Sequence, residues 1–280
     1  MSDTSKVWFI TGSSRGFGAE LVRAVLAHGD RVVATARQPK QLRALIEGHE
    51  DRARVFGLDV TNADAAVAAV DFAVAEFGRI DVVVNNAGYA NSAPIEETDP
   101  ADFRAQVEAN LFGVVNVTRA ALPVLRAQRC GVFVQFSSIG GRVGGTPGLG
   151  AYQTAKFAVE GFSEVLANEV SSFGLKVIIV EPGAFRTDWM GSSMTMHEPG
   201  SDYRDAVAFI HEMRRTANGS QPGDPARAAR IIIDVVESPE PPRRLLLGSD
   251  AVELALANGA ERDDEARKWA AVSRSTDFPE

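Results

Sequence analysis

Short runs of β-branched residues alternate with longer segments that repeat apolar residues at helical spacing, and this alternation constrains the fold more than any other feature. Seven runs read as strands: Val7–Ile10, Arg31–Thr35, Arg54–Leu58, Ile80–Asn85, Val132–Phe136, Lys176–Val180 and Arg244–Leu247. Four intervening segments have helical periodicity: Gly16–His28, Ala63–Phe77, Ala101–Arg126 and Ala151–Phe173. Alternation of this kind predicts parallel strands with helices on both faces. We therefore expect a doubly wound α/β fold of the Rossmann type, with about seven parallel strands.

The alternation covers nearly all of the 280 residues, so we expect a single domain over residues 1–280. Residues 187–222 interrupt it, and a connection this long is usually functional. We interpret this segment as a substrate loop or lid; a helical hairpin that buries its own apolar face is compatible with that reading. Asp224 and Pro225 predict the start of the next helix. After Leu247 we expect a short helix and then a polar tail over residues 261–280.

Composition excludes several classes of protein. The formal net charge of -8 argues against nucleic acid as a partner. The single cysteine, Cys130, rules out an intrachain disulfide, and four scattered histidines predict no metal site. Of these, His197 and His211 in the lid segment are expected to face solvent. No apolar run approaches the length of a membrane span and no signal peptide is evident, so we expect a cytoplasmic protein without membrane contact.

A glycine-rich turn, Thr11–Gly18, directly joins the first predicted strand to the first helix. Gly12 allows the tight turn, Gly16 lets backbone amides approach a pyrophosphate, and Gly18 permits close packing of the helix on the strand. The helix also points its positive dipole end at the phosphates. We expect the cofactor to contact Gly12, Ser14, Arg15, Gly16, Phe17 and Gly18.

The end of the second strand indicates which dinucleotide binds. A carboxylate there accepts from the ribose hydroxyl of NAD, whereas a 2′-phosphate requires arginine. The strand ends without an acid, Arg37 follows it, and Arg15 lies in the glycine turn. Since guanidinium groups pair strongly with phosphate, the sequence favours NADP(H). The alternative is that both arginines are solvated surface residues.

Tyr152 and Lys156 are four residues apart in a predicted helix. Side chains at this spacing are neighbours, so the ammonium group is expected to lower the pKa of the phenol. A phenol that exchanges its proton near neutral pH can serve as a general acid or base. The spacing by itself is also common on surface helices.

Further polar and turn residues end the predicted strands or interrupt a helix: Asp59-Val60, Asn85–Gly88, Asn110, Ser137-Ser138 and Pro182-Gly183. With the glycine turn and the Tyr152–Lys156 pair, this set closely resembles the short-chain dehydrogenase/reductase family, in its single-domain branch. The resemblance covers roughly residues 6–250.

The resemblance implies four catalytic roles. Tyr152 would donate or accept the proton at the substrate oxygen, and Ser138 would hydrogen-bond that oxygen. Lys156 would bind the nicotinamide ribose, and Asn110 would hold a water in a proton relay. Donors placed at an oxygen that gains negative charge stabilise the transition state. The resemblance thus implies an NADP(H)-dependent oxidoreductase that interconverts a carbonyl and an alcohol.

It also implies further cofactor contacts. Asp59 and Val60 would flank the adenine, and Asn85, Ala87 and Gly88 the adenosine ribose. The nicotinamide side would be contacted by Pro182, Gly183 and Thr187. Each of these residues also has a plainer reading as ordinary turn chemistry.

One spacing departs from the family. Ser138 precedes Tyr152 by 14 positions, one more than usual, with a glycine-rich loop between them. Such a loop can absorb an extra residue. Ser137 remains the alternative for the serine role.

Substrate and partners are less constrained. Trp189, Met190, Met194 and other apolar residues in the lid segment suggest a hydrophobic ketone, aldehyde or secondary alcohol. An epimerase or dehydratase on the same scaffold, and a non-enzymatic NADPH sensor, remain alternatives. The family resemblance also implies a homodimer or homotetramer.

Overall fold

The computed structural model describes residues 5–191 and 193–278. Seven strands form one parallel sheet in the order β3-β2-β1-β4-β6-β7-β9. These strands are β1 (Val7–Ile10), β2 (Arg31–Ala36), β3 (Ala53–Gly57), β4 (Val82–Asn85), β6 (Gly131–Phe136), β7 (Leu175–Pro182) and β9 (Arg244–Leu247). The predicted doubly wound Rossmann-type fold is confirmed, because the strand order reverses between β1 and β4.

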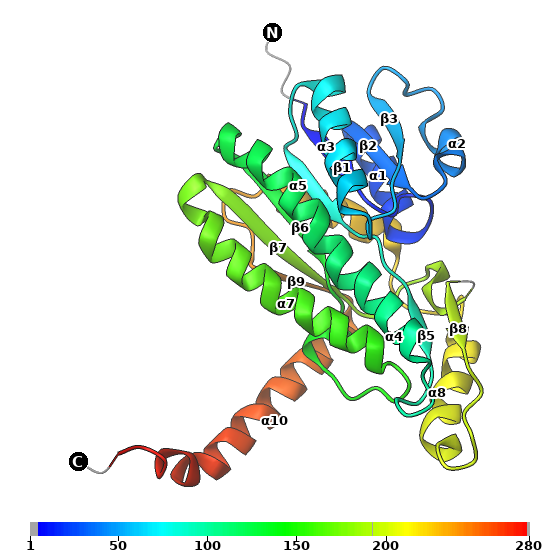
Figure 1. The fold of residues 1–280 in the computed structure, drawn as a ribbon, viewed down its shortest axis with the longest axis vertical. Helices are drawn as coiled ribbons and strands as arrows, with labels where there is room; N and C mark the ends of the chain where they lie inside the picture. The colour runs from blue at the N-terminus through cyan, green and yellow to red at the C-terminus, as the bar shows by residue number, and fades with distance from the viewer. Residues whose placement is uncertain (1–4, 192, 279–280) are drawn as a thin grey trace.

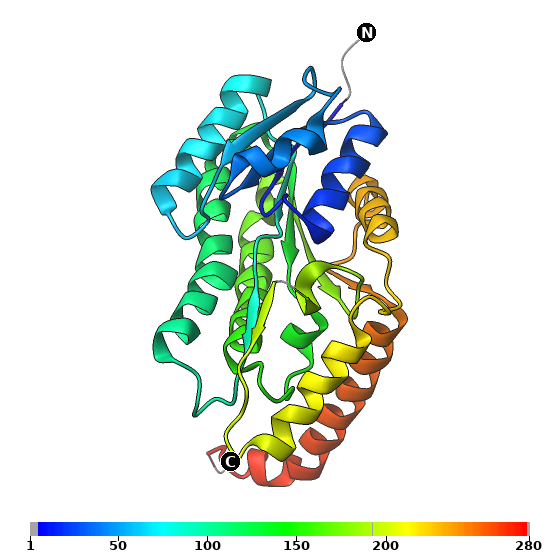
Figure 2. The ribbon, with the colours of Figure 1, turned by 90° about the vertical axis from the view of Figure 1, so that its right-hand side faces the viewer.

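Helices cover both faces of the sheet, as the edge-on view in Figure 2 shows. One face carries α3 (Ala63–Phe77), α5 (Gly113–Gln128) and α7 (Gly150–Val170), and the other carries α1 (Gly16–His28) and α9 (Pro225–Glu237). Shorter helices are α2 (Arg43–Ile46), α4 (Pro100–Val107) and α6 (Ile139–Arg142). Helix α9 begins as predicted, since the Asp224 side chain accepts hydrogen bonds from the Ala226 and Arg227 amides.

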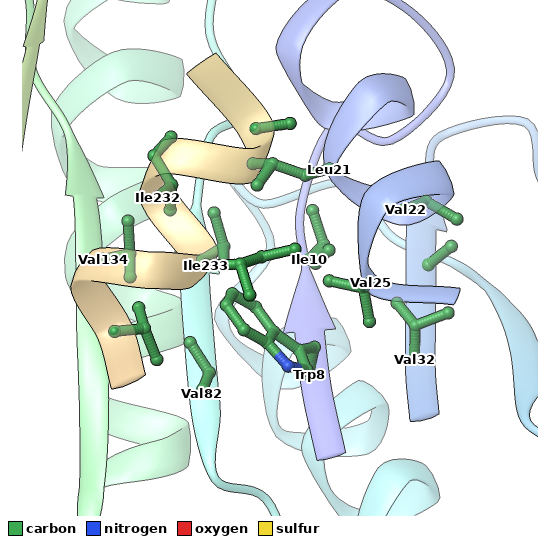
Figure 3. Packing of buried hydrophobic residues seen from close by; sticks show 14 of the residues in the cluster. Trp8, Ile10, Leu21, Val22, Val25, Val32, Val82, Val134, Ile232 and Ile233 are labelled. Carbon is green, nitrogen blue, oxygen red and sulfur yellow. The ribbon is translucent and has the colours of Figure 1, made fainter. Parts of the chain in front are cut away.

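Alternation along β1 divides the core between the two faces. Trp8 and Ile10 point to α1 and α9, where they meet Leu21 and Ile232 (Figure 3). Phe9 points to the opposite face and belongs to the second cluster, beneath α3, α5 and α7. Successive side chains of a strand face opposite ways, so one four-residue strand supplies both cores. Each fully buried side chain of this size stabilises the fold by about 1.5–3 kcal/mol.

A second, two-stranded sheet lies beside the main one. It pairs β5 (Ala90–Ser92) with β8 (Met194–Met196) in parallel register. After β8 the chain continues into α8 (Arg204–Ala217) and returns to the main body at α9. The segment 187–222 thus contains a strand and a helix, with β8 bonded to a segment about a hundred residues earlier. The sequence patterns did not predict this small sheet, because strands of three residues are too short to show a period.

The C-terminal part also differs from expectation. The short helix predicted after Leu247 is instead a 26-residue helix, α10 (Ser249–Arg274), which takes in most of the expected tail. It extends away from the sheet (Figure 1), and Leu256, Trp269 and Val272 on it are more than half exposed. In the part of the chain that is described, no helix combines the length and hydropathy needed to cross a bilayer.

Candidate active site

A cavity of about 510 Å³ opens at the carboxyl ends of the central strands, where parallel α/β sheets bind their ligands. Most of the residues predicted for catalysis or cofactor binding line it. They are Gly12, Ser14, Arg15, Gly16, Phe17, Arg37, Asp59, Val60, Ala87, Gly88, Asn110, Ser138, Tyr152, Lys156, Pro182, Gly183 and Thr187. Residues from eight separate segments, between Gly12 and Thr187, therefore converge on one space.

The glycine turn is held closely against the end of β4. Gly12 has a φ of 67°, and a Cβ there would lie 2.8 Å from the Ala87 Cα. The Asn86 side chain donates to the carbonyl oxygens of Thr11 and Gly12, at 2.9 and 3.1 Å. Gly18 does not line the cavity; a Cβ on it would lie 2.3 Å from the Gly12 oxygen. The expected contact of Gly18 with the cofactor is therefore corrected: this glycine allows α1 to pack closely against the glycine turn.

Asn85 is not where the resemblance placed it. Its side chain is 2% exposed and donates to Thr118 Oγ1 at 3.0 Å and to Gln135 Oε1 at 2.8 Å, beneath α5. Asn85 therefore does not line the cavity, and the expectation of a ribose contact is corrected. Because successive strand residues face opposite sides, the next residue, Asn86, is the one that lines the cavity.

The expected phosphate end of the cavity carries positive charge. Arg15 and Arg37 are exposed, line the cavity, and form no ion pair within the described part of the chain. The Asp59 carboxylate accepts from the Thr61 amide at 3.0 Å and from the Thr61 hydroxyl at 2.8 Å. This carboxylate caps a turn while it also lines the cavity.

Tyr152 lies in the first turn of α7 and is 7% exposed. Burial raises the pKa of its phenol to about 12, and a hydrogen bond with Ser138 lowers it by less. The expected lowering of this pKa is therefore corrected. Transfer of a phenolate out of water costs more free energy than the fixed groups around it return.

The Lys156 ammonium lies one helical turn further on. It donates to the Phe136 carbonyl oxygen at 2.8 Å and lies 5.7 Å from the centroid of the Tyr152 ring. Burial lowers the pKa of Lys156 to about 8, partly opposed by Glu160. The predicted proximity of the two side chains is confirmed, although the ammonium is directed at the end of β6.

Asn110 lies in a π-helical turn, Glu108–Phe112, between α4 and α5. Its amide group donates to the Tyr89 and Gln106 carbonyl oxygens, both at 2.8 Å, and its Oδ1 accepts from the Tyr89 amide at 3.2 Å. A Cβ at Gly88 would lie 2.4 Å from that Oδ1. The wider turn, a form often found at functional sites, accounts for an asparagine in an apolar helix.

The two candidate serines have different surroundings. The Ser138 hydroxyl accepts from the Gly140 amide at 3.0 Å and lies within reach of the Tyr152 phenol. The Ser137 hydroxyl donates to the Lys156 carbonyl oxygen at 3.4 Å, and a Cβ at Gly141 would lie only 2.4 Å from it. Of the two serines, Ser138 is therefore the one that hydrogen-bonds with Tyr152, whereas Ser137 bonds the backbone of α7.

The lid segment contacts the site through Trp189, which lies in a 3₁₀ turn, Asp188–Met190. Its ring packs on the Tyr152 ring with centroids 5.3 Å apart. His197 is exposed, as expected. His211 is 1% exposed, so the expectation that it faces solvent is wrong: it lies on the inner face of α8.

Over residues 6–198 the sequence matches the family described as short chain dehydrogenase. The chain belongs to the short-chain dehydrogenase family.

This short-chain dehydrogenase is 50% identical to oxidoreductase BOA17 of Botryotinia fuckeliana (strain B05.10), over 96% of this chain and 98% of the relative. A short-chain dehydrogenase from Streptomyces avermitilis superposes with a TM-score of 0.92 at 39% identity, covering 99% of this chain and 100% of that one. An alcohol dehydrogenase from Thermococcus sibiricus, complexed with 5-hydroxy-NADP, has a TM-score of 0.71 at 25% identity, covering 87% of this chain and 96% of that one. The protein is therefore an oxidoreductase.

Sequence patterns missed several residues that line this dehydrogenase's cavity. Asn86 and Tyr89 line it, and both stand beside residues that were predicted. Their signal was the polar run after β4, read one position too early. Within the described ranges no cluster of three or more His, Cys, Asp or Glu side chains could hold a metal ion.

Proposed function

We propose that this protein is an NADP(H)-dependent reductase of hydrophobic ketones or aldehydes, which also oxidises the corresponding alcohols. One observation carries the proposal: a buried phenol, Tyr152, with Ser138 within hydrogen-bonding reach, lies in the same cavity as the glycine turn and two arginines that form no ion pair with any residue described. Tyr152 and Ser138 are suited to proton transfer and hydrogen bonding at one oxygen atom of a substrate. The glycine turn and the two arginines are suited to binding a phosphorylated dinucleotide.

The residues present fit NADP(H). A Cβ at Gly12 or Gly18 would collide with backbone, so the close approach of the turn to β4 is built in. Arg15 and Arg37 offer guanidinium groups to a 2′-phosphate. The carboxyl end of β2, directly before Arg37, has no acidic residue that would compete for them. The solved alcohol dehydrogenase with an NADP derivative supports the same choice. When bound, the reduced cofactor supplies the hydride.

The chain's own residues manage the proton and the charge. Because its pKa is raised to about 12, Tyr152 is protonated at neutral pH and ready to donate to a carbonyl oxygen that gains negative charge. Ser138 donates a second hydrogen bond to that oxygen, so two groups are oriented before the reaction begins. Lys156, with a pKa of about 8, keeps a positive charge beside them. This protonation pattern supports reduction as the favoured direction near neutral pH.

Apolar side chains surround the reacting end and favour an apolar substrate. Ala90, Leu149 and Met194 form a cluster with Tyr152, and Trp189 packs against it. A substrate bound here removes apolar surface from water, at about 25 cal/mol per Å². We propose a ketone or aldehyde with an apolar or aromatic group next to the carbonyl.

We also propose that two or four copies associate. Phe112, Phe157 and Val165, from the π-helical turn and α7, are 37–58% exposed. Exposed apolar side chains of this size commonly mark a protein interface. Light scattering on the purified protein would measure the mass of the assembly.

The decisive test is a panel of ketones and aldehydes assayed by NADPH absorbance, with Tyr152→Phe as the matched control. We expect turnover of apolar carbonyls, a loss of about 10²–10⁴-fold in Tyr152→Phe, and unchanged NADPH binding measured by fluorescence. Tight NADPH binding without turnover of any carbonyl would overturn the reductase and favour an epimerase, a dehydratase or a sensor.

A further inference from the structure

Three polar side chains meet in the interior between β5 and α8. The Ser92 hydroxyl lies 2.8 Å from His211 Nε2 and accepts a hydrogen bond from the Arg214 guanidinium at 3.0 Å. Their exposures are 0%, 1% and 3%. None of the three lines the cavity that contains Tyr152. A buried polar group of this kind must have a structural reason, because its desolvation costs free energy.

The contacts of His211 favour the neutral form of its imidazole. Arginine only donates, so Arg214 occupies a lone pair of the Ser92 oxygen and leaves the Ser92 proton to be donated. The Ser92 oxygen has a second lone pair, so His211 Nε2 either accepts the Ser92 proton or donates to that lone pair. Nδ1 is buried and has no partner among the described residues. A charged imidazole would therefore bury an Nδ1–H without an acceptor and would share the Ser92 oxygen with the Arg214 guanidinium, so that two cations would meet at one hydroxyl group.

The charged groups around His211 also favour its neutral imidazole. Burial lowers the pKa of His211 most, and Arg214, Arg215 and His197 lower it further. Among the groups that affect the pKa of His211, only Glu198, on the segment after β8, raises it. It pairs with Arg215 at 2.7 Å and is 77% exposed, so its effect is screened.

This cluster joins the lid helix to the loop before the catalytic helix. A Cβ at Gly148 would lie 2.6 Å from the Ser92 oxygen and 3.3 Å from Val207 of α8. The Ala93 amide donates to the Gly148 carbonyl at 3.1 Å. Four residues after Gly148 comes Tyr152. The inner face of α8, formed by Val207, His211 and Arg214, thus rests on the residues that lead into the active-site helix.

We propose that His211 is a positioning residue that holds α8 against β5 only while its imidazole is neutral, so that acidification releases the lid from the substrate end. The consequence for the substrate rests on the proposed function; the release of α8 does not. The sign follows from the lowered pKa. A released histidine takes up a proton as the pH falls through about 6.5, while the buried one stays neutral. Below that pH the ratio of held to released molecules therefore falls by about tenfold per pH unit, down to the lowered pKa of His211.

Hydrogen exchange of the peptide over residues 204–217 in the full-length protein tests the release, after correction for the intrinsic pH dependence of exchange. We expect protection to fall by about tenfold per pH unit below about pH 6.5. His211→Gln offers Ser92 a neutral amide oxygen at every pH and should remove this dependence. His197→Gln, the matched control at an exposed imidazole, should keep it. Arg214→Gln keeps a donor to Ser92 but removes a charge that lowers the pKa of the held His211, so the fall in protection should end at a higher pH and be smaller in total.

Protection that is flat with pH in the wild type, or unchanged pH dependence in His211→Gln, would overturn the proposal. Should His211→Gln fold poorly, the smaller total fall in protection in Arg214→Gln decides, and a fall equal to or larger than that of the wild type counts against the proposal. In the reductase assay, the substrate KM should rise below pH 6.5 while NADPH affinity stays constant. An inactive carbonyl panel with pH-dependent exchange would sink the proposed function and leave the release of α8 standing.

Discussion

The indole ring of Trp189 packs on the phenol ring of Tyr152, with centroids 5.3 Å apart and planes inclined by 55°. Tyr152 comes from α7, and Trp189 comes from the turn that begins the lid segment. The residue proposed to transfer the proton is thus covered by the segment proposed to recognise the substrate. Substrate recognition and proton transfer are therefore proposed to occur at the same surface.

Replacement of Trp189 with Ala should discriminate between substrates by size. We expect kcat/KM for a bulky apolar ketone to fall about tenfold relative to that for a small one, because the bulky ketone loses its contact with the indole ring. An aromatic contact is worth about 0.5–1.5 kcal/mol beyond the apolar area that it buries. Phe209→Ala is the control in the same segment, since Phe209 is 70% exposed on the outer face of α8. Equal losses for large and small ketones would contradict a role for Trp189 in specificity.

The two serines should separate cleanly in steady-state kinetics. Ser138→Ala removes a donor at the substrate oxygen and should lower kcat by about 10²–10³-fold. Ser137→Ala should change kcat by less than about threefold, since Ser137 bonds the backbone of α7. Ser138 also caps α6, so Ser138→Thr, which keeps the hydroxyl, checks for loss through folding. The reverse ranking of the two alanine variants would transfer the role to Ser137.

Cofactor preference should depend on Arg37. Arg37→Asp replaces a cation with a carboxylate that suits a ribose hydroxyl, and the ratio of kcat/KM for NADPH over NADH should fall about a hundredfold. Arg43→Asp makes the same charge change at an exposed residue outside the cavity and should leave the ratio unaltered. A ratio unmoved by Arg37→Asp would falsify the phosphate contact.

The pH profile of reduction should report Lys156. Tyr152, with a pKa near 12, remains a donor over the accessible range, whereas Lys156 loses its charge as the pH rises through about 8. We expect kcat/KM for ketone reduction to be level at neutral pH and to fall above about pH 8. Activity that stays level up to about pH 10 would contradict a charged Lys156 in the reaction.

Stability should depend sharply on Gly18. A methyl group there meets the Gly12 carbonyl at 2.3 Å, and that backbone cannot easily move. We expect Gly18→Ala to lower the free energy of unfolding by about 1–3 kcal/mol. Gly259→Ala, in α10 with open space around it, should instead raise it by about 0.5–1 kcal/mol. Thermal unfolding of both variants measures the contrast, and equal melting temperatures would argue against the close packing.

The sequence by itself determined the features that are local. Strand periods of two, helical periods of 3.6 and a glycine turn at a fixed place predicted β1, α1 and α3 at their observed bounds. The site residues at strand ends followed from the same regularity, since parallel strands end at one edge. Even the helix start at Asp224 is a local matter of capping.

Tertiary structure decided what depends on contacts between distant segments. Asn85 faces α5 and Asn86 faces the cavity. Because the two neighbouring residues are both asparagine, the sequence does not show which of them lines the cavity. The pairing of β5 with β8, and with it the burial of His211, depends on segments about a hundred residues apart. The pKa of Tyr152 depends on the desolvation of its phenol in the assembled site, which outweighs the hydrogen bond with Ser138.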